Sequence, residues 1–285
     1  VYKDATEDTV VNFINAEIIK SRSSLVSVLK HGVEIAGYKI DLMYTKPATT
    51  FNKELLDKYN KNIFSVMEEV WASDTERVDL VVFLNGFAIM SFELKCNLAG
   101  QNYQDAIMQF RMNRSPKTRL FFFKAGCIVN FAMDLQEVYM TTRLAGESTF
   151  FLPFNMGSGT GIDAGKGNPI YADRYSVFYM WEDILKKDTV LDLISEFIFI
   201  ERKEKIDDVT GKVVAKESVI FPRYHQLDVI RKAIADVKVN RTSQNYLIQH
   251  SAGSGKTNSI AWLAHRLSSL HDDDNKIVFD NIIIC

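Results

Sequence analysis

The spacing of apolar residues changes along the chain, and each spacing predicts a different kind of element. Between residues 10 and 19, apolar positions recur at helical intervals, which predicts a helix. Further along, Val78–Leu84 and Phe87–Leu94 are β-rich runs separated by Asn85-Gly86, the pair preferred in two-residue hairpin turns. This pattern predicts a β-hairpin. After it, the sequence predicts a helix at 105–112 and short strands at 120–123, 127–132 and 138–142.

A charge-dense segment, residues 204–216, interrupts this alternation. Because large apolar residues are almost absent from it, we expect a linker or an exposed hairpin there. The segment divides the chain into a first domain, residues 1–203, and the beginning of a second, residues 217–285. In the second region the pattern predicts, in order, a helix at 224–237, a strand at 245–249, a helix at 256–270 and a strand at 277–285. Such a strand–helix–strand order opens a doubly wound parallel sheet.

Composition narrows the class of protein. The 285 residues are 47% hydrophobic and 25% charged, which is typical of a globular protein. No apolar run approaches the roughly 20 residues that span a bilayer, so we expect no membrane partner. The three cysteines form no CxxC pair, which disfavours a zinc site or a disulfide framework and favours a cytoplasmic location. With a net charge of −2, any binding to nucleic acid must use local basic patches.

The predicted hairpin carries two carboxylates and a lysine that its geometry brings together. Asp79 lies near the start of the first strand, and Glu93 and Lys95 lie near the end of the second. Residues two apart on a strand share a face, and a hairpin places the start of one strand beside the end of the other. Two convergent carboxylates can hold Mg²⁺, and a neighbouring lysine can orient water or stabilise charge during attack on a phosphate. The alternative is a pair of solvent-facing salt bridges.

Two features favour the catalytic interpretation of this hairpin. Both carboxylates interrupt otherwise apolar strands, where a buried charge costs several kcal/mol unless it is paired or bound to metal. Basic residues follow the predicted helix and form a plausible track for DNA phosphates. The members of this track are Arg111, Arg114, Lys117 and Arg119.

A second motif, SAGSGKT at residues 251–257, lies between a predicted strand and a predicted helix. Gly253 and Gly255 allow backbone N–H groups to turn toward phosphates, and the helix N-terminus favours an anion. Lys256 can reach the β- and γ-phosphates of ATP, and the hydroxyl of Thr257 can hold Mg²⁺. Together with Ser254, these residues predict an ATP-binding loop.

This loop resembles the first motif of superfamily-2 helicases and translocases. The general pattern GxxxxGK[ST] has a glycine where this chain has His250, whereas the small-Ala-Gly-x-Gly-Lys-Thr form fits that superfamily. The resemblance extends to FPRYHQ at residues 221–226, because in these motors an upstream glutamine contacts the adenine. It assigns that role to Gln226. The hairpin residues Asp79, Glu93 and Lys95 in turn resemble the motif of PD-(D/E)xK nucleases. The fold that these two resemblances imply is α/β, with a PD-(D/E)xK nuclease-like mixed-sheet domain followed by the start of a RecA-like superfamily-2 motor domain.

The order of these motifs resembles the restriction (R) subunit of type I restriction–modification enzymes along nearly the whole chain. The resemblance implies that Asp79 and Glu93 hold Mg²⁺ and that Lys95 assists phosphodiester hydrolysis. Many members carry a QxxxY element on the next helix; Gln109 matches it, but Asn113 stands at the tyrosine position. An acid on the first helix often supports such sites, and Glu7 and Glu17 both remain candidates.

The same resemblance implies a DNA-cleaving subunit that translocates double-stranded DNA with ATP. Its implied partners are a modification subunit, which binds S-adenosylmethionine, and a specificity subunit, which recognises the DNA sequence. Two alternatives stay open. One is a nucleic-acid helicase or translocase whose N-terminal domain does not cut, and the other is a structural or adaptor domain whose hairpin charges form salt bridges.

Overall fold

The computed structural model describes residues 6–47, 51–158, 165–206, 211, 213–241, 244–272 and 276–285. Part of the charge-dense segment, residues 207–210 and 212, lies outside the described residues. The chain divides into two compact units, Val1–Phe221 and Pro222–Cys285.

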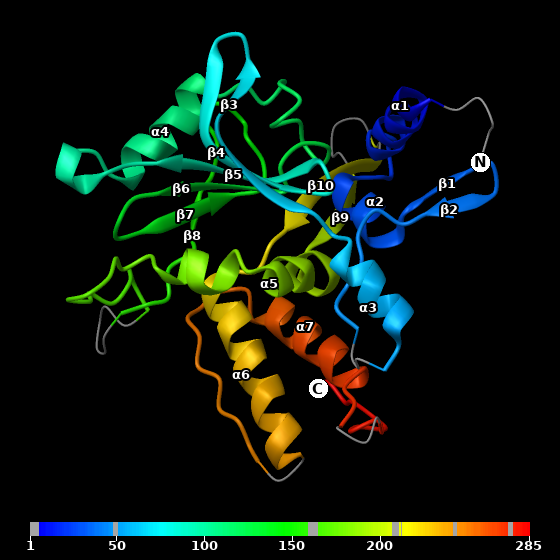
Figure 1. Ribbon diagram of the computed structural model, residues 1–285. Helices are drawn as coiled ribbons and strands as arrows, with labels where there is room; N and C mark the ends of the chain where they lie inside the picture. The colour runs from blue at the N-terminus through cyan, green and yellow to red at the C-terminus, as the bar shows by residue number, and fades with distance from the viewer. Residues whose placement is uncertain are drawn as a thin grey trace. The chain divides into compact units, whose positions relative to one another are not determined.

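A mixed sheet forms the centre of the first unit (Figure 1). Among the described residues it has six strands in the order β3-β4-β5-β6-β7-β8. Strands β5 and β6 are parallel, and the other neighbours are antiparallel. Parallel neighbours require a crossover, and helix α4 lies on that connection. The bounds are β3 (Phe64–Ser73), β4 (Glu76–Leu84), β5 (Phe87–Leu94), α4 (Tyr103–Asn113), β6 (Val129–Met133), β7 (Val138–Thr141) and β8 (Leu152–Pro153).

The predicted hairpin is confirmed as β4 and β5. Phe83 pairs with Ala88 and Leu84 with Phe87, which leaves Asn85 and Gly86 as a two-residue turn. Both turn residues have positive φ, 50° and 85°, as a type I′ turn requires. The pair Asn-Gly tolerates this backbone and sets the register next to the turn. Further along, the register shifts by one residue between Val82 and Phe83.

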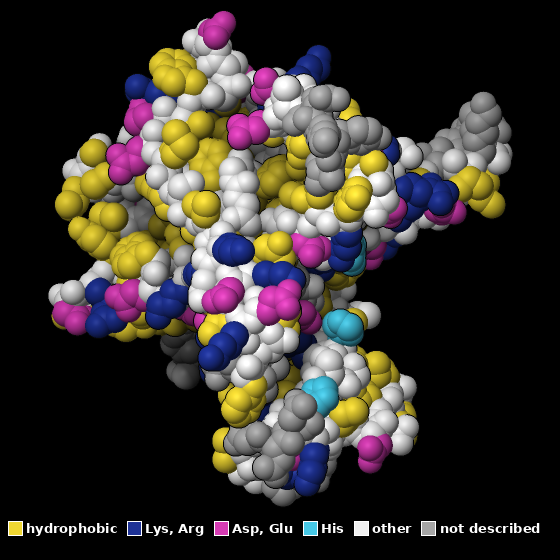
Figure 2. Space-filling model, turned by 45° about the vertical axis from the view of Figure 1, so that its right-hand side comes forward, with side chains coloured by type: hydrophobic (Ala, Val, Ile, Leu, Met, Phe, Trp, Pro, Cys, Tyr) yellow, Lys and Arg dark blue, Asp and Glu magenta, His cyan; other side chains and the backbone are white. Residues whose placement is uncertain are grey.

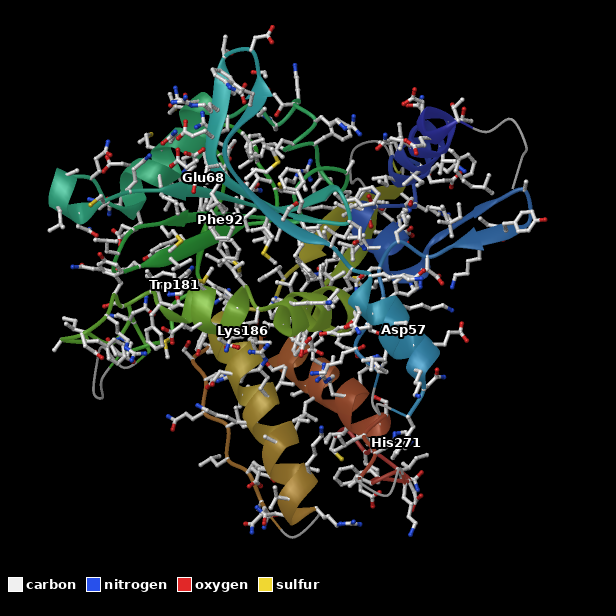
Figure 3. The ribbon with its side chains drawn as sticks, viewed as in Figure 1. Asp57, Glu68, Phe92, Trp181, Lys186 and His271 are labelled. Carbon is white, nitrogen blue, oxygen red and sulfur yellow. The ribbon has the colours of Figure 1, made fainter. Side chains whose placement is uncertain are left out.

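The two faces of the sheet bury different side chains. On one face, Phe92 of β5 stacks on Phe131 of β6 with ring centroids 5.1 Å apart, and Phe154 and Phe221 pack edge-on against Phe131. Figure 3 labels Phe92 in this interior position and Glu68 of β3, which is exposed. The opposite face packs against α4 and contains the next residue of β6, Ala132. Alternation along β5 therefore directs Glu93, the residue after Phe92, toward α4.

Capped helices and a small hairpin precede the sheet. Thr6, Ser24 and Asn52 each accept a hydrogen bond from the backbone N–H three residues later, which satisfies an otherwise unpaired donor. The elements of this region are α1 (Glu7–Ile18), α2 (Leu25–His31), β1 (Val33–Ile35), β2 (Tyr38–Ile40) and α3 (Lys53–Asn60). After the sheet come α5 (Lys187–Asp192), flanked by π-helical turns at Met180–Ile184 and Leu193–Phe197.

Strands β9 (Phe199–Ile206) and β10 (Val213–Ile220) occupy most of the charge-dense segment. Two contacts bind β10 to the rest of the first unit. The Thr142 hydroxyl donates to the Val219 carbonyl at 2.9 Å, and the Lys124 ammonium lies 2.6 Å from Glu217. The structure therefore divides the chain after Phe221, whereas the charge pattern alone places the first domain's end at residue 203.

The second unit contains helices α6 (Tyr224–Asn240) and α7 (Lys256–Ser268). Both agree with the predicted helices. The strands predicted at 245–249 and 277–285 are wrong, because the described residues there form no ladder. A strand needs a neighbour for its N–H and C=O groups. Among the described residues of these two runs, an isolated bridge joins Ile277 to His271, and no further pairing extends it.

The strand predicted at 120–123 is also wrong. The segment forms turns in which the Cys127 and Gly126 amides donate to the carbonyls of Leu120 and Phe122. A Cβ on Gly126 would lie 2.3 Å from the Leu120 oxygen, so glycine permits this tight chain reversal.

Surface charge is mixed on the face shown in Figure 2, where Lys and Arg side chains alternate with Asp and Glu. No helix among the described residues is long and apolar enough to cross a membrane.

Candidate functional site

Asp79 and Glu93 are brought together by the β4–β5 register. Leu80 pairs with Phe92, so the next positions outward on the two strands are Asp79 and Glu93. The Leu94 amide donates to Asp79 Oδ2 at 2.7 Å, which fixes the Asp79 carboxylate against β5. Lys95 Nζ lies 3.8 Å from the same Oδ2 atom. The hairpin therefore gathers the three side chains that its sequence singles out.

Glu93 is wholly buried, with an exposed fraction of 0%. Its Oε1 atom accepts a 2.7 Å hydrogen bond from Arg114 Nε, and no described residue donates to Oε2. Burial raises the pKa of Glu93 to about 7, even though the Arg114 hydrogen bond and charge act in the opposite direction. The charge of Asp79 adds to the increase in pKa. The site therefore contains a carboxylate oxygen that lacks a partner in a desolvated position.

A cleft of about 1170 Å³ opens beside these residues. Asp79 and Lys95 line it from the hairpin, and Gln109 and Asn113 line it from α4. Figure 1 shows α4 beside the hairpin that β3 and β4 form. The structure thus places Gln109 with the hairpin residues, and it places Asn113 at the same cleft.

The four basic residues of the expected DNA track separate in the structure. Arg111 lines the cleft and donates from Nε to the Thr149 carbonyl at 3.1 Å. Arg114 also lines it, but its guanidinium is buried in the ion pair with Glu93. Lys117 and Arg119 are not part of the cleft wall, and Arg119 Nη2 donates to Asn15 Oδ1 at 2.8 Å. The four basic side chains therefore do not form an exposed row.

Neither acid of α1 is at the cleft. Glu7 and Glu17 are not among the residues that line it, and Glu17 forms an ion pair with Lys20. The cleft wall also contains Trp71 of β3 and Arg77 of β4, which the sequence motifs do not single out. They are cross-strand partners, and the Arg77 guanidinium carbon lies 5.6 Å from the Trp71 ring centroid. Only the strand register, which depends on the folded sheet, reveals this pair.

The hairpin carboxylates could supply some of the oxygen ligands that a hard divalent cation needs. Among the described residues, no group of three or more His, Cys, Asp and Glu side chains could hold a metal ion. Mg²⁺ does not need such a cage, because it retains waters and binds through one or two carboxylates together with substrate phosphate. The unpartnered Glu93 Oε2 atom, beside Asp79, is the kind of oxygen that such a cation would complete.

In the second unit, the glycine-containing loop at residues 251–255 leads directly into α7. Gly253 and Gly255 have φ values of +73° and +84°, a conformation that side-chain-bearing residues rarely adopt. Lys256 is the first residue of α7, and its ammonium donates to the carbonyls of His250 and Ser251 at 3.2 and 2.9 Å. The Thr257 side chain is exposed at the helix N-terminus. Ser254 is buried, and its hydroxyl has no partner among the described residues.

Gln226 contacts this loop directly. Its Nε2 atom donates to the Gly255 carbonyl at 2.9 Å, and its Oε1 atom accepts from the Arg223 amide at 2.8 Å. A Cβ at Gly255 would approach Nε2 to 2.5 Å. Next to it, His225 Nε2 lies 3.1 Å from the Ser254 carbonyl, and burial lowers the pKa of His225. The geometry shows Gln226 bracing the loop, a contact that the motif alone does not specify.

Comparisons with known proteins match the chain to one family. The model of the family described as type I restriction enzyme R protein N terminus matches residues 7–149, half of the chain. In Methanocaldococcus jannaschii, the "Putative type I restriction enzyme MjaVIIIP endonuclease subunit" is 26% identical over 98% of this chain and 25% of its own length. The MjaVIIP counterpart from the same organism is 26% identical over 88% of this chain and 22% of its own length. The chain therefore spans about a quarter of the length of these relatives.

Proposed function

Since the chain belongs to the family of the type I restriction enzyme R protein N terminus, we propose that it is the DNA-cleaving part of a restriction subunit. The proposed reaction is Mg²⁺-dependent hydrolysis of a phosphodiester in double-stranded DNA. The observation that supports it most strongly is the meeting of Asp79, Lys95 and Gln109 at one cleft, with Glu93 buried behind them. These side chains come from two strands and a helix, so their meeting depends on the fold.

Each side chain at the cleft has a proposed role. Asp79 and Glu93 would hold the cation, which when bound supplies Lewis-acid activation of the scissile phosphate. Lys95, already close to Asp79, would stabilise negative charge on the phosphate or orient the attacking water. Gln109 and Arg111, which are two residues apart on α4 and both line the cleft, would contact the DNA backbone.

For the second unit, we propose ATP binding at residues 253–257 and the start of a RecA-like superfamily-2 motor. The positive φ angles of Gly253 and Gly255 and the position of Lys256 at the start of α7 support a phosphate site. Thr257 would hold the nucleotide-bound Mg²⁺. Gln226, held against Gly255, would couple the loop to the adenine.

The activity of the complete protein extends beyond this chain. We propose that the full subunit translocates double-stranded DNA with ATP and acts with modification and specificity subunits. S-adenosylmethionine would bind the modification subunit. The names of the Methanocaldococcus relatives, both endonuclease subunits of type I restriction enzymes, support this assignment.

Cleavage of a supercoiled plasmid by the full complex, with ATP and Mg²⁺, tests the proposal. Asp79→Ala and Lys95→Ala should each abolish cleavage while ATP hydrolysis and translocation continue. Lys256→Ala should abolish ATP hydrolysis and translocation. Unchanged cleavage by both hairpin variants would refute the nuclease assignment, and unchanged ATP hydrolysis by Lys256→Ala would refute the motor assignment.

One observation favours a second candidate, a translocase with a non-catalytic first unit. Both hairpin carboxylates already have basic neighbours, Lys95 for Asp79 and Arg114 for Glu93. Ion pairs that serve only the fold would look the same. The plasmid assay separates the two functions, because a structural hairpin predicts translocation without any cleavage in the unmodified protein.

A further inference from the structure

We propose that Arg114 is a positioning residue that holds the Glu93 carboxylate ready for the divalent cation. This inference rests on the proposed nuclease function. Arg114 lies at the C-cap of α4, and its side chain is almost entirely buried. It therefore differs from the exposed phosphate contact that its place in a basic sequence suggests.

The position of the Arg114 guanidinium is set by the backbone. Nη1 donates to the Asn113 carbonyl at 3.0 Å, and Nη2 donates to the Arg77 carbonyl at 2.7 Å. One acceptor belongs to the end of α4 and the other to β4, so the planar group bridges the helix and the sheet. Because guanidinium donors have a fixed fork geometry, these two bonds determine where the Nε donor points.

The Nε donor of Arg114 contacts one oxygen of Glu93. Nε lies 2.7 Å from Oε1, while Oε2 has no partner among the described residues. An ionised carboxylate without compensation would be costly at a fully buried position. Arg114 supplies the compensating charge from one side and leaves the second oxygen available. The carboxylate is thus oriented, and part of its charge is compensated, before any cation arrives.

The arrangement also explains how a buried carboxylate can serve an open cleft. Arg114 lines the cleft, whereas Glu93 lies behind it. Asp79 lines the same cleft and lies beside Glu93 across the β4–β5 pair. A cation entering beside Asp79 would meet a carboxylate whose other oxygen is already fixed. Residues that orient a metal ligand typically change metal affinity about 10- to 100-fold when they are mutated.

Mn²⁺ binding to the full-length subunit, without DNA or nucleotide, tests this role independently of cleavage. We expect Arg114→Met to raise the Kd for Mn²⁺ by about 10- to 100-fold. Arg114→Lys keeps a charge but cannot reproduce the three-acceptor fork, so we expect an intermediate Kd. Isothermal titration calorimetry gives the affinity, and the electron paramagnetic resonance spectrum of Mn²⁺ reports the change in its ligands.

A double-mutant cycle shows whether Arg114 acts through Glu93. In a Glu93→Gln background, adding Arg114→Met should weaken Mn²⁺ binding little further, because the ligand being positioned is already lost. Lys124→Met is the matched control, since it breaks another ion pair of the first unit, with Glu217. It should lower the melting temperature and leave the Mn²⁺ Kd unchanged.

Three results would overturn the proposal. The first is that folded Arg114→Lys binds Mn²⁺ with the wild-type Kd. The second is that Arg114→Met raises the Mn²⁺ Kd as much in the Glu93→Gln background as it does alone. The third is that Glu93→Gln alone leaves the Mn²⁺ Kd at the wild-type value. The last result would also count against the proposed nuclease function, whereas the first two would leave that function intact. Melting curves of each variant identify any that fails to fold. Of the two Arg114 variants, Arg114→Lys should fold better, because it retains the positive charge beside the buried Glu93.

Discussion

Replacing Glu93 with glutamine should change how stability depends on pH, because Glu93 has no exposed surface and an unusual pKa. Burial raises its pKa from the ordinary value of 4.5 to about 7. The folded chain therefore binds this proton more tightly than the unfolded chain does. Stability from this source is fully present below pH 4.5 and is lost as the pH rises to about 7 and above. Glutamine has a similar shape and does not titrate in this range.

The magnitude follows from the two pKa values. A pKa difference of one corresponds to about 1.4 kcal/mol, so the change from 4.5 to about 7 corresponds to roughly 3 kcal/mol. Between pH 5 and pH 8, wild type should lose about 2.5 kcal/mol of unfolding free energy relative to Glu93→Gln. Solvent screening reduces this value little, because the carboxylate is fully buried.

Urea unfolding in EDTA measures the effect. Both chains carry Trp262→Phe, so that tryptophan emission comes from Trp71 and Trp181 of the first unit. The difference in unfolding free energy between wild type and Glu93→Gln should move steadily between pH 5 and pH 8. A difference that stays constant within about 0.5 kcal/mol over that range would show that Glu93 titrates normally and that our account of its environment is wrong.

Three further changes test other parts of the structure. Gly255→Ala should disrupt the proposed ATP-binding loop, because its Cβ would lie 2.5 Å from Gln226 Nε2 at a φ of +84°. Equilibrium dialysis with ATP should show lost binding, and retained binding would contradict the loop geometry. Trp71→Ala removes a ring that is 63% exposed on the cleft wall. Fluorescence anisotropy should then show about tenfold weaker DNA binding, whereas an unchanged Kd for DNA would mean that the DNA binds elsewhere. Phe131→Ala removes the central ring of the aromatic face and should lower the free energy of unfolding in urea by about 3 to 5 kcal/mol. A decrease below about 1 kcal/mol would mean that the neighbouring side chains repack into the cavity.

Local sequence signals were sufficient for the elements that depend on near neighbours. Asn85-Gly86 specifies a two-residue turn, and the runs on either side have enough β-branched and aromatic residues to pair. The amphipathic pattern likewise predicts α6 and α7. These elements satisfy their own hydrogen bonds or those of an adjacent segment, so a short window of sequence contains what is needed.

Elements that depend on distant partners were predicted less well. The run at 245–249 is apolar enough for a strand, yet the described residues form no ladder there, since strand formation requires a neighbour rather than a propensity. The turns at 120–123 arise because Gly126 lets its chain approach Leu120 closely, which an apolar run cannot reveal. The boundary between the units has the same cause. Glu217 and Val219 follow the charge-dense segment, where the sequence predicts the second domain to begin, but contacts with Lys124 and Thr142 bind them to the rest of the first unit.

The site shows how far a sequence pattern can determine the role of a residue. A carboxylate within an apolar strand indicates that a charge is buried and must be compensated, and this reasoning singles out Glu93. It does not indicate the compensating group, because Arg114 is 21 residues away and reaches Glu93 only when α4 covers that face of the sheet. Viewed in sequence, Arg114 belongs to a basic cluster with Arg111, Lys117 and Arg119. The fold separates it from that cluster, since it alone satisfies a buried acid, and so the same side chain changes from an expected DNA contact to a residue that orients a proposed metal ligand.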